Sequence, residues 1–92
     1  MLIGCPTEIK PQEFRVGLTP SAATELVAHG HQVLIQSGAG LGAGFTDADY
    51  IAAGAEIVPD APTVFDRAEM IVKVKEPQPA ERAMLRRGQV LL

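Results

Sequence analysis

Short apolar segments alternate with short helical patterns along the chain, and this alternation constrains the fold more than any other feature of the sequence. Strands separated by helices at this spacing predict an α/β fold, with a parallel, Rossmann- or flavodoxin-like sheet and helices on both faces. Because the last apolar segment is followed by neither a turn nor a helix, we expect the sheet to be incomplete at the C-terminus. The expected strands are Leu2–Cys5, Gln32–Gln36, Glu56–Val58, Met70–Val74 and Gln89–Leu92.

Capping residues mark where the intervening helices begin and end. Thr19 followed by Pro20 is typical of an N-cap and a first helical turn, and Gly30 is placed to end that helix. Thr46 and Asp49 have the spacing of a capping box. Comparable signals predict helices over 46–54, 60–67 and about 79–87.

Length, charge and composition exclude several classes of protein. A chain of 92 residues allows one domain, and 47% hydrophobic with 21% charged residues is an ordinary globular balance. The net charge of −3 and an aromatic content of 4% argue against a nucleic-acid-binding protein. The uncharged run Leu26–Thr46 contains five glycines, so we expect no membrane span. With no targeting signal and Cys5 as the only cysteine, we expect a cytoplasmic protein without disulfides.

A glycine-rich segment, Gly38–Ala43, matches the dinucleotide-binding pattern G-x-G-x-x-[G/A], and Asp60 follows Gly40 by 20 residues. Two features weaken this interpretation. The helical pattern begins only at Thr46, although the fingerprint needs a helix that opens within the glycines. Asp60 is also well placed as an N-cap. We therefore favour a structural loop that needs positive φ angles, and we assign no cofactor-binding residue here.

Basic residues near strand ends give a second candidate site. Lys73 and Lys75 close the fourth strand, and Arg15 follows the first strand, so all three should lie at the carboxyl edge of the sheet, where parallel sheets bind ligands. An arginine fork and a lysine ammonium together suit a small carboxylate with a neighbouring carbonyl. The alternative is that these are solvated loop charges, paired with Glu13 and Glu76.

The remaining polar groups predict no further chemistry. His29 and His31 flank the end of a helix and lack additional ligands, so we expect no metal site. Asp47, Asp49 and Glu56 are scattered, and helix capping explains them better than acid–base catalysis.

Separate blocks of sequence, in one order and spacing, resemble the N-terminal part of bacterial alanine dehydrogenases, and the resemblance covers the whole chain from Met1 to Leu92. The blocks are Ile3-Gly4-x-Pro6-x-Glu8, Arg15-Val16-x-Leu18-Thr19-Pro20, Gly38-Ala39-Gly40-x-Gly42-x-Gly44-Phe45, Ala53-Gly54-Ala55 and Val72-Lys73-Val74-Lys75-Glu76-Pro77.

This resemblance implies an oxidoreductase that converts L-alanine, NAD and water into pyruvate, ammonia and NADH, and that works as a hexamer of two-domain subunits. In that family Arg15 would bind the substrate carboxylate and Lys75 would contact and polarise the substrate carbonyl. The family's NAD-binding domain and catalytic histidine lie beyond this chain. Residues 1–92 are then part of the substrate-side domain, and we expect no turnover from them alone.

Two related families and one other class of protein remain as alternatives. The alpha subunit of nicotinamide nucleotide transhydrogenase shares the early Arg-x-x-x-Thr-Pro block but resembles this chain less at Lys75 and at 42–45. The saccharopine-forming reductases match these blocks less well. A non-catalytic α/β binding module would keep the fold without the chemistry.

Overall fold

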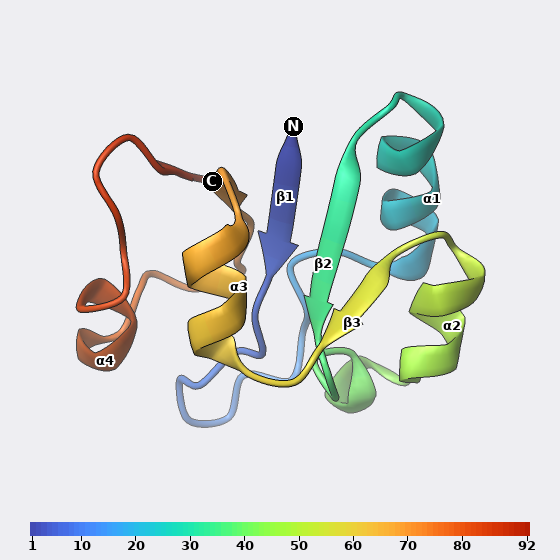
Figure 1. Ribbon diagram of the computed structural model, residues 1–92. Helices are drawn as coiled ribbons and strands as arrows, with labels where there is room; N and C mark the ends of the chain where they lie inside the picture. Colours follow the sequence, from blue (N-terminus) through green and yellow to red (C-terminus); the bar gives the residue numbers. More distant parts are fainter.

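The computed structural model describes residues 1–92 and contains a five-stranded sheet in which every neighbouring pair of strands is parallel. The strand order is β3-β2-β1-β4-β5, and Figure 1 shows β1, β2 and β3 side by side. The predicted parallel α/β fold is therefore confirmed. The strands are β1 (Leu2–Cys5), β2 (Gln32–Gln36), β3 (Glu56–Val58), β4 (Met70–Ile71) and β5 (Val90–Leu91).

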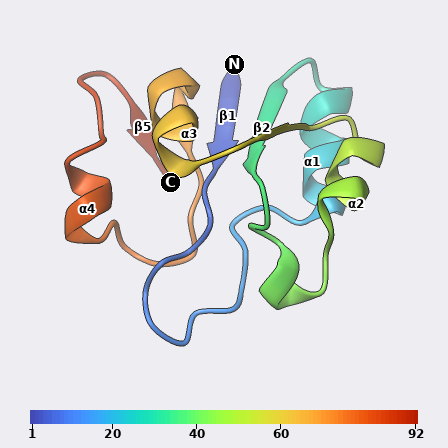
Figure 2. The same ribbon diagram turned by 60° about the horizontal axis from the view of Figure 1, so that its bottom comes forward.

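Strand order creates a topological switch point between β1 and β4. From β1 the chain adds β2 and β3 in one direction, then returns to the other side of β1 to add β4 and β5. The connections that follow β1 and β4 therefore leave the sheet beside each other and in opposite directions. In open parallel sheets this is where ligands bind. Figure 2 views the fold with this edge turned forward.

Helices cover both faces of the sheet because alternate strand residues point to opposite sides. Ile3, Cys5, Val33 and Ile35 belong to the core cluster that also contains residues of α1 and α2. Leu34 belongs to a second cluster, which contains Val64 and Phe65 of α3. The helices are α1 (Pro20–Ala28), a 3-10 turn η1 (Leu41–Ala43), α2 (Asp47–Ala52), α3 (Ala61–Arg67) and α4 (Pro79–Arg82). The longest has nine residues, and none is long and apolar enough to cross a membrane.

The helix starts follow the predicted caps. Thr19 accepts a hydrogen bond from the backbone of α1, and Thr46 and Asp49 form a complete capping box at α2. Asp60 accepts hydrogen bonds from the backbone N–H and the hydroxyl of Thr63 at 2.9 and 2.6 Å. Local hydrogen bonding of polar side chains therefore sets where these helices begin.

The fourth strand is shorter than the sequence predicts, and this changes the placement of both lysines. It ends at Ile71 rather than Val74. Lys73 has only 2% of its side chain exposed, whereas 39% of the Lys75 side chain is exposed. In a continuous strand residues 73 and 75 would share one face, and their different exposure fits the end of β4 at Ile71.

The fourth helix is also shorter than predicted and ends at Arg82 rather than Arg87. The chain then turns back toward α3, where the Arg86 guanidinium donates to the carbonyls of Phe65 and Ala68 at 3.2 and 2.7 Å. Arg86 thus satisfies carbonyl groups at the end of α3.

Candidate functional site

The two loops at the switch point contribute the predicted site residues. Arg15 lies in the connection between β1 and α1, and Lys75 lies in the connection between β4 and α4. The structure brings them together through a third side chain, Glu13. The Arg15 guanidinium donates from Nε and Nη2 to the two Glu13 oxygens at 3.0 and 2.8 Å, and Nζ of Lys75 lies 3.8 Å from Oε1 of Glu13.

The Glu13 carboxylate is a shielded acceptor between two accessible cations. Only 5% of its side chain is exposed, against 68% for Arg15 and 39% for Lys75. Hydrogen bonds from the side chain and backbone of Arg15 lower the pKa of Glu13 to about 2, so it stays ionised at neutral pH. Together the three groups leave one net positive charge at this position, which suits a ligand with one carboxylate.

The geometry of Arg15 leaves part of its guanidinium available. Glu13 occupies the edge formed by Nε and Nη2, while the edge formed by Nη1 and Nη2 has no carboxylate partner. A guanidinium can bind a second carboxylate in bidentate fashion through that edge. Of the partners that the solvated-charge alternative assigned, Glu13 is present, but Glu76 forms its ion pair with Lys10 instead.

Lys73 belongs to a different, buried group of charges. Its Nζ lies 3.0 Å from Oε1 of Glu8 and 2.9 Å from Oε2 of Glu81, and all three side chains are at most 2% exposed. Burial opposes the positive charge, but the hydrogen bonds that the ammonium donates to Glu81 and Glu8, with their negative charges, outweigh it, so the pKa of Lys73 lies above its ordinary value. Lys73 is thus a structural cation, and Lys75 is the accessible one.

The glycine-rich loop is packed as a turn. A Cβ at Gly40 would lie 2.7 Å from the Tyr50 ring, and one at Gly42 would lie 2.9 Å from the carbonyl oxygen of Phe14. Gly38 and Gly44 have φ angles of 81° and 91°. The loop opens only the three-residue turn η1. With Asp60 engaged at the start of α3, these residues do not fit the pyrophosphate and ribose of a dinucleotide.

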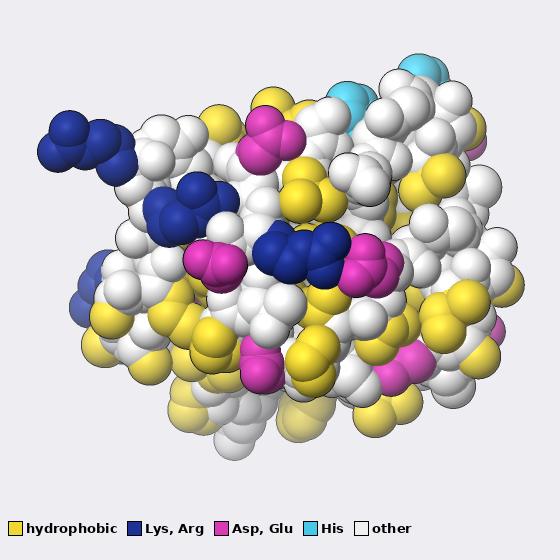
Figure 3. Space-filling model, in the orientation of Figure 1, with side chains coloured by type: hydrophobic (Ala, Val, Ile, Leu, Met, Phe, Trp, Pro, Cys, Tyr) yellow, Lys and Arg dark blue, Asp and Glu magenta, His cyan; other side chains and the backbone are white.

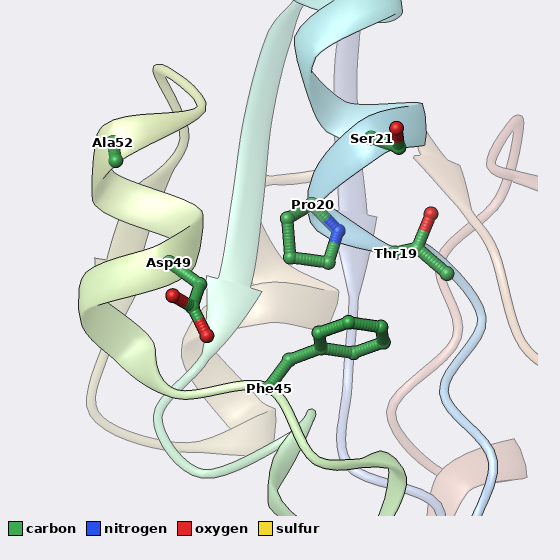
Figure 4. Close-up of a pocket in the computed structure, with 6 residues that line it drawn as sticks. All are labelled: Thr19, Pro20, Ser21, Phe45, Asp49 and Ala52. Atoms are coloured by element: carbon green, nitrogen blue, oxygen red, sulfur yellow. The ribbon is translucent and has the colours of Figure 1, made fainter.

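The largest hollow in the molecule lies away from Arg15 and Lys75, between the first turns of α1 and α2 (Figure 4). It measures about 500 Å³, and its polar groups include Thr19 and Asp49, which already cap these helices. Elsewhere, Figure 3 shows acidic and basic side chains interspersed on the visible face, with hydrophobic atoms between them. A smaller hollow of about 340 Å³ is lined by Lys73–Pro77, Leu91 and Leu92, so Lys75 borders a hollow beside its contact with Glu13.

The sequence predicted Arg15 and Lys75 as site residues, gave no role in the site to Glu8, and considered Glu13 only as a competing ion-pair partner. Both glutamates lie in the long connection after β1, where acidic residues are usually solvated. The sequence feature that could have pointed to both glutamates is the position of their loop at the carboxyl end of a buried strand.

The chain matches relatives of two related kinds over nearly its whole length. The alanine dehydrogenase of Halomonas elongata is 56% identical over 91 residues, which are 99% of this chain and 24% of the relative. The NAD(P) transhydrogenase subunit alpha of Cereibacter sphaeroides is 48% identical over 92 residues, all of this chain and 18% of the relative. The chain thus spans about a quarter or less of the length of these curated relatives.

Solved structures show the same two kinds of relative. An L-alanine dehydrogenase superposes with a TM-score of 0.96 at 56% identity, over 99% of this chain and 25% of that one. A transhydrogenase from Sinorhizobium meliloti superposes with a TM-score of 0.92 at 30% identity, over 99% of this chain and 26% of that one. The model of the family "Alanine dehydrogenase/PNT, N-terminal domain" matches residues 4–92. The chain therefore belongs to the alanine dehydrogenase/PNT N-terminal domain family.

Proposed function

We propose that this chain is the substrate-side part of an NAD-dependent alanine dehydrogenase, which converts L-alanine, NAD and water into pyruvate, ammonia and NADH. The observation that carries the proposal is the convergence of Arg15 and Lys75 on one carboxylate at the switch point. The identity to alanine dehydrogenases supports the same reading. The complete enzyme would be a cytoplasmic homohexamer, as the family resemblance implies.

In the proposed reaction Arg15 binds the carboxylate of pyruvate or alanine. Its free guanidinium edge provides two parallel N–H donors, while Glu13 holds the opposite edge and fixes the plane of the fork. The substrate is thereby held by one end, and its second carbon has a defined position relative to Lys75.

Lys75 acts on the carbonyl group of pyruvate. Its ammonium donates a hydrogen bond to the carbonyl oxygen and draws electron density from the carbonyl carbon, which favours the addition of ammonia there. The negative charge that develops on that oxygen is stabilised by a cation already in place. The glycine-rich loop and Asp60 do not fit NAD, so this proposal assigns the cofactor to a part of the enzyme outside residues 1–92.

The test compares two lysines in the complete polypeptide that the gene encodes. Pyruvate amination is followed by the loss of NADH absorbance. Lys75→Ala should lower kcat/KM by at least about 100-fold, the scale for losing one preorganised donor. Lys10→Ala is the matched control, because Lys10 is 40% exposed and also pairs with a glutamate. Equal effects of the two substitutions would contradict the role of Lys75.

Two further outcomes separate the alternatives. Hydride exchange between NAD(H) and NADP(H), without alanine-dependent NAD reduction, would identify a transhydrogenase subunit, the alternative that the 48% identity favours. Absence of both activities in the complete polypeptide would leave the non-catalytic binding module. Residues 1–92 expressed alone should show no turnover, and NADH-dependent amination by them would contradict the proposed division of the site.

A further inference from the structure

Sheet hydrogen bonding stops just before Lys75: the backbone N–H of Val72 donates to the carbonyl of Gly4 at 2.9 Å, and that of Lys73 donates to the carbonyl of Leu92 at 3.4 Å. Strand β4 ends at Ile71, and the backbone N–H groups of Val74 and Lys75 donate to no backbone carbonyl. Without such bonds both the backbone of Lys75 and the ammonium at the end of its four-carbon side chain would be mobile. A site that depends on the position of the Lys75 ammonium therefore needs another source of order.

Glu8 provides that order from the connection after β1. Its Oε2 accepts a hydrogen bond from the backbone N–H of Val74 at 3.0 Å. Its Oε1 accepts one from the backbone N–H of Lys75 at 3.3 Å and one from Nζ of Lys73 at 3.0 Å. All the hydrogen bonds that this carboxylate accepts thus come from three consecutive residues. The two bonds from backbone N–H groups fix the backbone of Val74 and Lys75.

A carboxylate is suited to this task, and a neutral amide is not. Both Glu8 oxygens accept, whereas a glutamine would place an NH₂ group against either the Val74 N–H or the Lys73 ammonium. The ion pair with Lys73 compensates for burying the Glu8 charge. Glu81 contacts the same ammonium from α4, and its other oxygen accepts from the backbone of Gln78. Glu81 therefore shares the ion cluster without accepting a hydrogen bond from the backbone of Val74 or Lys75.

We propose that Glu8 is the positioning residue for Lys75: it acts on the reaction by fixing the backbone of Val74 and Lys75, and it does not contact the substrate. This inference rests on the proposed function, because it takes Lys75 to be the residue that polarises the substrate. It assigns the buried ion cluster a part in catalysis besides its contribution to stability.

The kinetic test is a double-mutant cycle in the complete polypeptide. Glu8→Gln should lower kcat/KM for pyruvate amination by about 10- to 100-fold, the cost of misplacing a catalytic group by roughly an ångström. In a Lys75→Ala background the same substitution should change the residual rate, followed over hours at high enzyme concentration, by less than about twofold. If Glu8 served only the stability of the fold, Glu8→Gln would lower the rate by the same factor in both backgrounds.

Glu81→Gln is the matched control for loss of stability. It removes one buried carboxylate from the same ammonium and leaves the backbone of 73–75 untouched. Glu81→Gln should therefore lower kcat/KM by the same factor whether residue 75 is lysine or alanine. Equal behaviour of Glu8→Gln and Glu81→Gln in the cycle would overturn the proposal.

A second measurement uses the wild-type protein, so it tests the proposal even if the Glu8→Gln variant does not fold. In the wild-type polypeptide, hydrogen exchange at the backbone amides of Val74 and Lys75 should be at least about tenfold slower than at Glu76 in the same loop. Exchange as fast as at Glu76 would overturn the proposal. A wild-type protein without alanine-dependent NAD reduction would instead contradict the proposed function, and the exchange result would still decide whether Glu8 fixes the loop.

Discussion

Replacing Lys73 by methionine should destabilise the fold far more than the same change at Lys75. Lys73 is 2% exposed and lies 3.0 and 2.9 Å from two buried carboxylates. At an effective dielectric constant of about 20, each contact is worth about 5–6 kcal/mol of Coulomb attraction, and desolvation of the three ions cancels much of the total. Removing only the cation keeps the cost of burying both carboxylates. The expected loss is about 3–5 kcal/mol, out of a total domain stability of about 5–15 kcal/mol.

Lys75 is the internal control because it lies two residues away and makes one contact at 3.8 Å with 39% of its side chain exposed. Lys75→Met should cost less than about 1 kcal/mol. The assay is urea unfolding of the chain, with a stabilising osmolyte if the Lys73 variant is unfolded in buffer. Equal losses for Lys73→Met and Lys75→Met would refute the electrostatic reasoning.

The pH dependence gives the same cluster a second signature. Because the pKa of Lys73 is raised in the folded chain, its contribution to stability is complete below its ordinary value of 10.5. That contribution should disappear as the pH rises beyond this point. Lys73→Met should therefore remove part of the alkaline loss of stability, and an unchanged pH profile would contradict the assignment.

Three more predictions follow from neighbouring groups. Carbon NMR should show Glu13 titrating near pH 2, so that its contribution is present above pH 4.5 and lost as the pH falls toward 2; Arg15→Ala should return the pKa toward 4.5. Burial raises the pKa of Cys5 to about 11, so thiolate absorbance should appear near that pH and alkylation at pH 8 should be slow in the folded chain. Gly40→Ala should lower the free energy of unfolding by about 1–3 kcal/mol in a urea titration, because its Cβ would lie 2.7 Å from Tyr50.

Local sequence signals predicted the secondary structure where a side chain bonds to its own neighbourhood. Thr19, Thr46 and Asp60 each cap the helix that was expected to begin beside them. Apolar runs likewise located the buried strands β1 and β2. These features depend on contacts between residues a few positions apart, so short sequence patterns are enough to predict them.

Features that depend on distant residues could not be predicted in this way. Glu8 and Lys73 are 65 residues apart, and only the order of strands brings them together. The burial of Lys73 in this ion cluster was likewise not predicted, because its two carboxylate partners come from the connection after β1 and from α4. The rule about sheet edges proposed Arg15, Lys73 and Lys75 together, and the family resemblance gave roles to Arg15 and Lys75. Glu13 was considered as an ion-pair partner, but its contact with both Arg15 and Lys75 is seen only in three dimensions.

The most direct test of the central claim is a crystal structure of the complete polypeptide with pyruvate bound. The account predicts both carboxylate oxygens about 2.7–3.2 Å from the Nη1 and Nη2 edge of Arg15, and the carbonyl oxygen at hydrogen-bond distance from Nζ of Lys75. Pyruvate bound elsewhere, or bound with Lys75 still directed only at Glu13, would contradict it.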